Sequence, residues 1–176
     1  GWEQVRIAPG ITAATPLDFV SYPITHSLAP VLGWAALVAA GYWFLCRYPR
    51  GGVVLAACVI SHWLLDALVH RPDLPLYPGG TMRIGLGLWS SIGTTLAIEL
   101  PIFVIGLWLY MRTTAPRDPV GYWSLWSLVA FLLVIYAPNL LGPPPPGVTA
   151  LAWVAQAQWL LVWWGYWIDR HRRTVG

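Results

Sequence analysis

The sequence predicts an all-α protein, a polytopic membrane helix bundle of about five transmembrane helices. Of its 176 residues, 57% are hydrophobic and only 10% are charged, and the mean hydropathy is +0.60. A water-soluble domain of this size needs far more charge to cover its surface. We therefore expect lipid to surround most of the chain.

Five apolar runs supply the predicted helices. A bilayer core about 30 Å thick requires roughly 20 apolar residues in a helix. Such runs occupy residues 27–46, about 53–69, about 84–111, about 120–141 and about 149–168. Helix-breaking or charged segments separate them, such as the Arg-Tyr-Pro-Arg-Gly-Gly stretch after the first run and the proline run after Gly142.

The placement of arginine predicts the orientation. Most arginines lie in the loops after the first and third runs and in the tail: Arg47, Arg50, Arg112, Arg117, Arg170, Arg172 and Arg173. Because basic residues concentrate in cytoplasmic loops, we place these three segments in the cytoplasm. The expected organisation is an outward-facing segment 1–26, a transmembrane bundle 27–169 and a cytoplasmic basic tail 170–176, in which His171 is a solvated charge.

Composition also limits the expected partners. The basic residues form no stripe interleaved with aromatic side chains, so nucleic acid is not an expected partner. The expected partners are membrane lipids and other membrane subunits. Trp159, Trp163, Trp164 and Trp167 crowd the last helix, where tryptophan is typical of the membrane–water interface. A cofactor or pigment cage is the alternative interpretation.

Ionisable residues within the apolar runs form the candidate site, since charge at membrane depth is costly and marks function. His62, Asp66 and His70 are spaced four apart and therefore share one face of the second helix. A neutral imidazole and a carboxylate at this spacing form half of a divalent-metal site. Asp18 and His26 precede the first helix on the same outward side, and Glu99 enters from the third helix.

The convergence of these groups predicts a divalent metal site for zinc, with manganese or iron as alternatives. The expected metal ligands are His26, His62, Asp66 and His70, with Glu99 or Asp18 as the catalytic base. Structural interpretations remain open for several of them. His62 and Asp66 can bond to each other, His70 can cap its helix or lie at the interface, and Glu99 can be an ion-pair partner. Thr25 and Ser27 are expected to cap the first helix.

These motifs carry a resemblance to a known family. Thr25, His26 and Ser27 before one helix, then Ser61, His62 and Asp66 in the next, resemble the YdjM-like family of inner-membrane proteins. The stretch from His62 to Trp89 is similar to one bacterial subgroup of it. The resemblance covers most of the chain and implies a bacterial inner-membrane protein with a metal site of His26, His62 and Asp66, with Asp18 as a further ligand.

The family is described as predicted metal-dependent hydrolases, distantly related to zinc-dependent phospholipase C and P1-type nucleases. The resemblance therefore implies hydrolysis of a phosphoester or similar bond in a lipid-associated substrate. Family members usually begin with another membrane segment that bears a histidine and an acid, and this sequence begins after that point. The implied site lacks those two groups here.

The sequence also allows two hypotheses other than a hydrolase for the function of this protein. The first is a non-catalytic integral-membrane subunit of a larger complex, which packs against proteins or pigments and keeps a vestigial metal site. Its tryptophans and the small residues Gly85, Gly87 and Gly93 suit such packing. The second is a transporter, although no internal repeat is evident.

Overall fold

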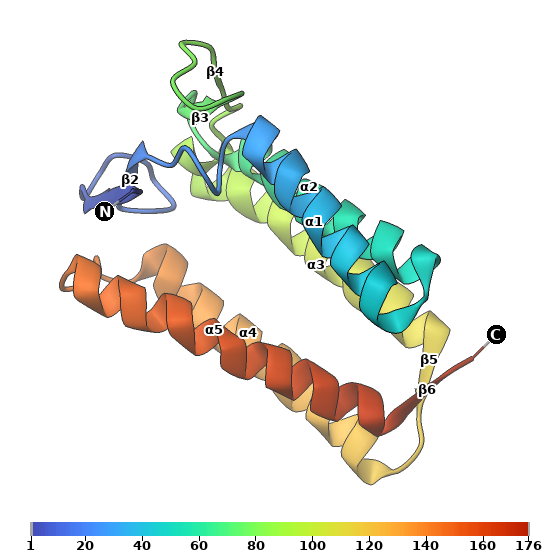
Figure 1. The fold of residues 1–176 in the computed structure, drawn as a ribbon. Coiled ribbons are helices and arrows are strands. Elements are labelled where there is room, and N and C mark those ends of the chain that lie inside the picture. The colour runs from blue at the N-terminus through green and yellow to red at the C-terminus, as the bar shows by residue number, and fades with distance from the viewer. Residues whose placement is uncertain (1, 176) are drawn as a thin grey trace. The chain divides into compact units, whose positions relative to one another are not determined.

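The computed structural model describes residues 2–175, and five long helices dominate them (Figure 1). The helices are α1 (Leu28–Cys46), α2 (Pro49–Val69), α3 (Ile92–Thr113), α4 (Pro119–Leu141) and α5 (Val148–Arg170). The all-α class is confirmed. Gly1 and Gly176, the outermost residues of the expected N-terminal segment and tail, lie outside the described residues.

Short strands and one 3-10 turn connect the helices. The antiparallel strand pairs are β1 (Gln4–Ile7) with β2 (Leu17–Ser21), β3 (Leu74–Pro75) with β4 (Arg83–Ile84), and β5 (Thr114–Pro116) with β6 (Arg172–Thr174). The 3-10 turn is η1 (Leu88–Ser90). The chain divides into an N-terminal unit that ends at Ser91 and a C-terminal unit that begins at Ile92.

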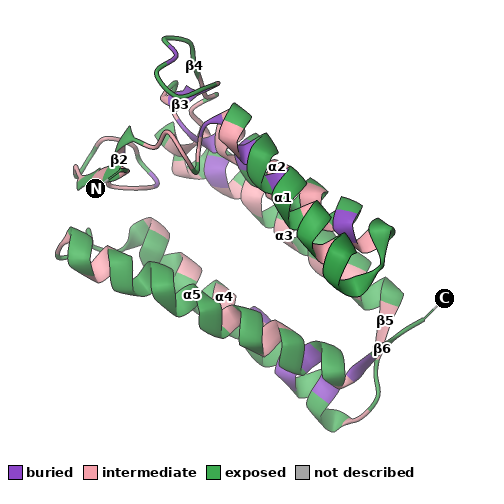
Figure 2. Cartoon of the chain, in the orientation of Figure 1, coloured by how far each residue is buried: buried purple, intermediate pink, exposed green. Residues whose placement is uncertain are grey.

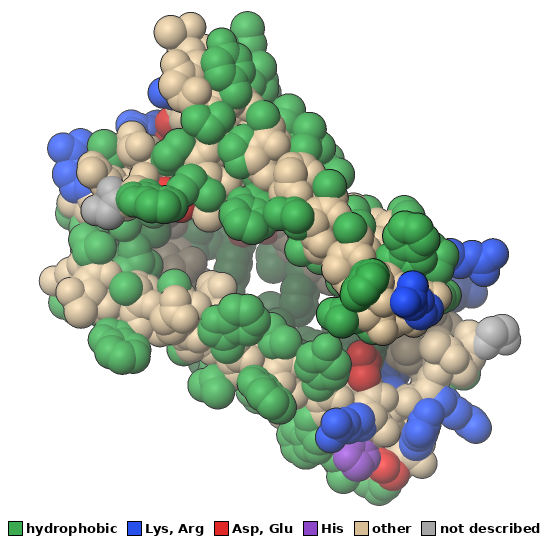
Figure 3. Space-filling view, in the orientation of Figure 1, with side chains coloured by type: hydrophobic (Ala, Val, Ile, Leu, Met, Phe, Trp, Pro, Cys, Tyr) green, Lys and Arg blue, Asp and Glu red, His purple; other side chains and the backbone are tan. Residues whose placement is uncertain are grey.

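Four of these helices, α1 to α4, are long and apolar enough to cross a membrane. Only 6% to 17% of each span is buried within the protein, and the exposed helix surfaces are largely hydrophobic (Figures 2 and 3). Apolar surface of this extent requires lipid contact, so the chain is a multi-pass membrane protein. The fifth helix, α5, is equally long but carries Gln156 and Gln158 and is less apolar.

In the N-terminal unit, α1 and α2 form an antiparallel hairpin. Arg47 ends α1 in the left-handed conformation, with φ of 54°, and donates its backbone N–H to Trp43 O over 2.8 Å. Pro49 then begins α2 four residues before the expected start, because proline suits the first helical turn. Gly52 extends the helix through the predicted break. A Cβ at Gly52 would lie 2.8 Å from Ala39 O, so the two backbones approach closely there.

The third helix begins at Ile92, so the expected start near residue 84 was wrong. Residues 85–87, the glycine loop, instead cross the C-terminal end of α2. Leu86 N donates to Ala67 O over 2.9 Å, and Gly87 N donates to His70 O over 2.7 Å. Gly85 adopts φ of +158° in close contact with the backbone of Arg71. These bonds satisfy carbonyls that the end of a helix leaves unpaired.

In the C-terminal unit, α4 packs against α5 around a small core of Leu125, Val129 and Ile168. Trp164 Nε1 donates to Ser124 O over 3.2 Å, which holds one expected interfacial tryptophan, partly buried, against this core. Asp118 caps α4, since its carboxylate accepts from Gly121 N over 2.9 Å.

The basic tail packs onto this unit, so the expectation that His171 is a solvated charge was wrong. His171 Nδ1 lies 2.7 Å from Asp118 Oδ2, and β6 pairs with β5. Arg172 is buried and donates to Gly121 O, Thr114 O and Thr114 Oγ1, each over 3.0 Å. The buried guanidinium therefore has carbonyl and hydroxyl partners that offset its desolvation.

The Asp118 contacts predict a pH-dependent stability. His171, and then Gly121 N, hold the pKa of Asp118 below its usual value. Because the pKa of Asp118 is lower in the folded state than its unfolded-state value near 3.9, the ionised carboxylate stabilises the fold above that value. The stabilisation is lost as the pH falls through the folded-state pKa. Asp118→Asn keeps a helix cap but removes the charge, so we expect it to lower the melting temperature at pH 7. The difference from wild type should narrow progressively as the pH falls below about 4.

Thermal unfolding followed by circular dichroism in detergent measures this difference. Thr12→Ser, a conservative change in the N-terminal unit, serves as the control variant. A gap between wild type and Asp118→Asn that is the same at pH 7 and pH 3 would contradict the role of the Asp118 charge.

Candidate metal centre

Three predicted ligands meet at one end of the α1–α2 hairpin. His26 lies two residues before α1, while His62 and Asp66 occupy successive turns of α2. His62 Nε2 lies 2.9 Å and His26 Nε2 lies 3.5 Å from the same oxygen, Asp66 Oδ2. One donor atom from each residue falls within 4.8 Å of the other two. We call these residues the triad.

The triad fits a divalent metal by its donor spacing. Ligand atoms about 2.0–2.1 Å from a tetrahedral zinc lie about 3.3 Å apart, and the separations of the two imidazole nitrogens from Asp66 Oδ2, 3.5 Å and 2.9 Å, bracket that value. Two imidazoles and one carboxylate are also a ligand set that zinc uses when a fourth position remains open for water or substrate.

Asp66 Oδ2 supplies a second test. This oxygen is buried and accepts no hydrogen bond of acceptable geometry from the described residues. His62 Nε2 lies 2.9 Å from it, at ion-pair distance. A buried carboxylate oxygen without a hydrogen bond is costly, and a cation between the imidazoles would satisfy it.

A hydrogen-bond chain orients His26. Thr25 Oγ1 donates to Glu3 Oε2 over 2.8 Å and lies 2.6 Å from His26 Nδ1. Because the hydroxyl has only one proton to donate, it must accept from His26 Nδ1–H, which leaves the Nε2 lone pair directed at the triad. Trp63 Nε1 donates to His26 O over 3.0 Å and holds the backbone at this position.

The charges along this chain agree with ligation. Burial lowers the pKa of His26, with a smaller lowering from His62 and His70 that the Asp66 carboxylate opposes. The imidazole is therefore neutral at pH 7, as a ligand must be. Burial raises the pKa of Glu3, but hydrogen bonds from Thr25 and from Ile24 N outweigh it and keep the pKa below the usual value.

His70, the fourth predicted ligand, lies beside the triad rather than in it. Its ring is buried between Phe19 and Trp89, with centroid distances of 4.5 Å and 4.7 Å. His70 Nδ1 lies 3.0 Å from Asp73 Oδ1, and its centroid is 6.1 Å from that of His26.

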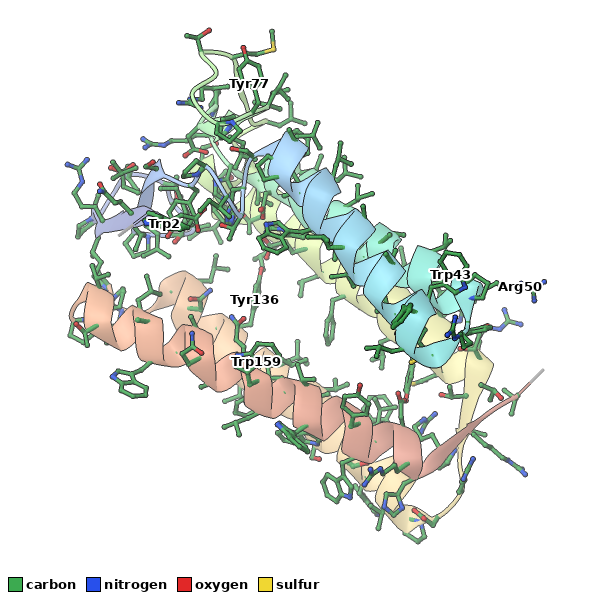
Figure 4. The ribbon with its side chains drawn as sticks, viewed as in Figure 1. Trp2, Trp43, Arg50, Tyr77, Tyr136 and Trp159 are labelled. Atoms are coloured by element: carbon green, nitrogen blue, oxygen red, sulfur yellow. The ribbon has the colours of Figure 1, made fainter. Side chains whose placement is uncertain are left out.

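The two predicted catalytic acids have different surroundings. Asp18 is buried and bridges two guanidinium groups, those of Arg6 and Arg71. Glu99 belongs to the C-terminal unit, where Tyr136 OH donates to its Oε2 over 2.8 Å (Tyr136 is labelled in Figure 4). Glu99 and the triad therefore belong to different units of the chain.

The expected capping roles of Thr25 and Ser27 differ from what the structure shows. Ser27 is the N-cap residue of α1, but its side chain makes no capping hydrogen bond. Thr25 instead belongs to the chain that orients His26. Sequence reasoning missed Glu3, because no local spacing relates it to Thr25, 22 residues further along.

A cavity of about 470 Å³ adjoins the triad at the same end of the hairpin. His26 and His70 line it together with the charged residues Arg6, Asp18, Arg71, Asp73 and Arg83. Its remaining walls come from β2 and from the loop that contains β3 and β4. Figure 4 labels Tyr77 on that loop, and Trp43 and Arg50 at the opposite end of the hairpin.

Fold and site together define a class: a multi-pass helical membrane protein with a candidate centre of two histidines and one aspartate beside a polar cavity. No protein-family model, curated protein or solved structure gives a match to this chain. The resemblance to the YdjM-like family therefore stays a prediction from the short motifs.

Proposed function

We propose that this protein is a membrane-embedded, metal-dependent hydrolase of a phosphoester or similar bond in a lipid-associated substrate. The observation that carries the proposal is the triad, in which the buried Asp66 Oδ2 lies between two imidazole nitrogens. Zinc is the metal that best suits this donor set, with manganese or iron as alternatives. The YdjM-like resemblance points to the same chemistry.

Each residue has a defined part in this proposal. A divalent metal lowers the pKa of a bound water and polarises the scissile group. His26, His62 and Asp66 hold that ion, and Thr25 with Glu3 keeps His26 in the tautomer that presents Nε2. Asp18 accepts hydrogen bonds from two arginines. Its role in this proposal is therefore to hold those two cations in place rather than to act as the catalytic base. Glu99, which accepts from Tyr136 in the C-terminal unit, stays the alternative acid.

The proposed location is the outer face of a bacterial inner membrane, with a cytoplasmic C-terminus. The triad lies at one end of the α1–α2 hairpin and Arg47 and Arg50 lie at the other, as the arginine rule requires. In the C-terminal unit, the β5–β6 pairing places the tail beside the Arg117 loop. This arrangement supports a fifth crossing by α5.

Elemental analysis of the purified, detergent-solubilised protein tests the function. We expect about one equivalent of zinc, manganese or iron in wild type, and almost none in His62→Ala and Asp66→Ala. His171→Ala, in the other unit, is the matched control and should keep its metal. Metal-loaded wild type should then cleave bis(p-nitrophenyl) phosphate, and the two triad variants should not.

The absence of bound metal in well-folded wild type would reject the hydrolase proposal. Metal that persists in both triad variants would place the ion elsewhere and would also reject this site. Circular dichroism of each variant confirms that the loss of metal does not reflect unfolding.

A non-catalytic membrane subunit is the second candidate, and the surface of α5 favours it. Trp153, Trp159 and Trp163 are 73%, 65% and 73% exposed, and exposed tryptophans suit contact with protein or pigment. This function predicts a stoichiometric partner chain or a visible absorbance after purification in a mild detergent. It also predicts no phosphodiesterase activity in the metal-loaded protein.

A further inference from the structure

We propose that the cavity beside the triad binds a phosphate group of the substrate through Arg83, Arg6 and Arg71. The inference rests on the proposed function only in assigning this phosphate to the substrate. Binding of the anion itself follows from the charges and donors of the cavity.

The cavity carries a surplus of positive charge. Three arginines and two aspartates line it, and these five side chains together carry one net positive charge. A cationic concavity with low-dielectric walls raises the local concentration of anions. The cavity therefore favours an anionic ligand over a neutral or cationic one.

Two of the arginines are held in place and retain free donors. Buried Asp18 accepts from Nη2 of Arg6 and from Nη2 of Arg71, and Asp73 accepts from Arg71 Nε over 3.1 Å. A guanidinium has five N–H donors, so each arginine keeps donors that these carboxylates do not use. The side chains of Arg6 and Arg71 are 71% and 43% exposed, which leaves those donors accessible.

Of the three cavity arginines, Arg83 differs from the other two in having no counter-ion among the described residues. It lies on β4, where its backbone pairs with Pro75, and its side chain forms no ion pair with any residue between 2 and 175 that the structure describes. An unpaired guanidinium on the cavity wall is free to meet an incoming anion. Arginine binds phosphate in a bidentate manner, which lysine cannot match.

The position of the cavity relates this anion to the triad. His26 lines the cavity and also directs Nε2 at Asp66 Oδ2, 3.5 Å away. A phosphate held by the arginines therefore lies next to the metal ligands. A volume of about 470 Å³ accommodates a phosphorylated headgroup of small-molecule size.

Calorimetric titration of the full chain in detergent with inorganic phosphate tests the proposal. We expect Arg83→Gln to weaken phosphate binding by about tenfold or more. Arg50→Gln, at the opposite end of the hairpin, removes the same charge far from the cavity and should bind as wild type does. The metal content of Arg83→Gln should equal that of wild type.

The metal-free Asp66→Ala variant separates this site from the triad. Phosphate binding that survives in Asp66→Ala and falls in Arg83→Gln supports the arginine site even if the hydrolase proposal fails. Absence of phosphate binding in wild type would overturn the inference while leaving the metal result intact. Equal binding in Arg83→Gln and wild type would also overturn it, as would acetate competing as strongly as phosphate.

Short-chain phosphatidic acid and glycerol phosphate distinguish the two sources of the anion. Stronger competition by dihexanoyl phosphatidic acid supports a phosphate on a lipid headgroup. Equal competition by glycerol phosphate supports a soluble phosphoester bound through the same arginines.

Discussion

Gly85→Ala is expected to destabilise the N-terminal unit by roughly 2–4 kcal/mol. A Cβ at this position would lie 2.2 Å from Arg71 O and 2.5 Å from His70 O, both of them backbone atoms. To relieve the contact, the glycine loop would have to move off the end of α2. Ala67 O and His70 O would then lose the N–H groups of Leu86 and Gly87. Thermal unfolding in detergent measures the effect.

Gly87→Ala is the matched control in the same loop. Gly87 also has a positive φ, +72°, but a Cβ added there would lie 4.0 Å from its nearest neighbouring atom. The substitution should therefore cost only about 1 kcal/mol, the backbone penalty alone. Equal melting temperatures for the two variants would show that the close approach at Gly85 does not matter. Because Arg71 lines the cavity, Gly85→Ala should also weaken phosphate binding.

Thr25→Val is expected to weaken metal binding by about 10- to 100-fold. The substitution removes the hydroxyl between Glu3 and His26, so His26 Nδ1–H loses its acceptor at 2.6 Å. The imidazole can then adopt the other tautomer or rotate, and Nε2 no longer faces Asp66 in every molecule. Competition with a fluorescent zinc chelator measures the affinity.

Thr25→Ser provides the rescue, because it keeps the hydroxyl and should restore the wild-type affinity. Glu3→Gln should also weaken metal binding, since one side of the amide is an NH2 group that cannot accept the bonds that reach that side of Glu3. An affinity of Thr25→Val equal to that of wild type would show that the hydroxyl does not orient His26. If Thr25→Ser is as weak as Thr25→Val, the effect comes from packing instead.

Part of the candidate site was predictable from local spacing. His62 and Asp66 are four residues apart in a helix, so they face the same side whatever the rest of the chain does. His26 required the topology as well, since only the hairpin of α1 and α2 returns the start of α1 to the end of α2. Both predictions agree with the grouping of the three side chains.

Other parts depended on contacts that no local pattern encodes. Glu3 reaches Thr25 through the β1–β2 hairpin, and Arg83 reaches the cavity through β4. The third apolar run looked helical from residue 84, yet hydrogen bonding to the end of α2 holds its first residues in a loop. His171 looked like a solvated charge until β6 paired with β5 and brought it to Asp118.

The sequence by itself determined that lipid surrounds this protein and which segments form its long helices. Both follow from nearby residues alone: the apolar content of a segment decides its transfer to lipid, and its local periodicity decides its helical faces. The tertiary structure decided which polar groups meet. Close packing at Gly52 and at Gly85 sets how α1, α2 and the glycine loop approach one another. Those approaches, between residues distant in sequence, place His26 against Asp66 and the arginines around one cavity.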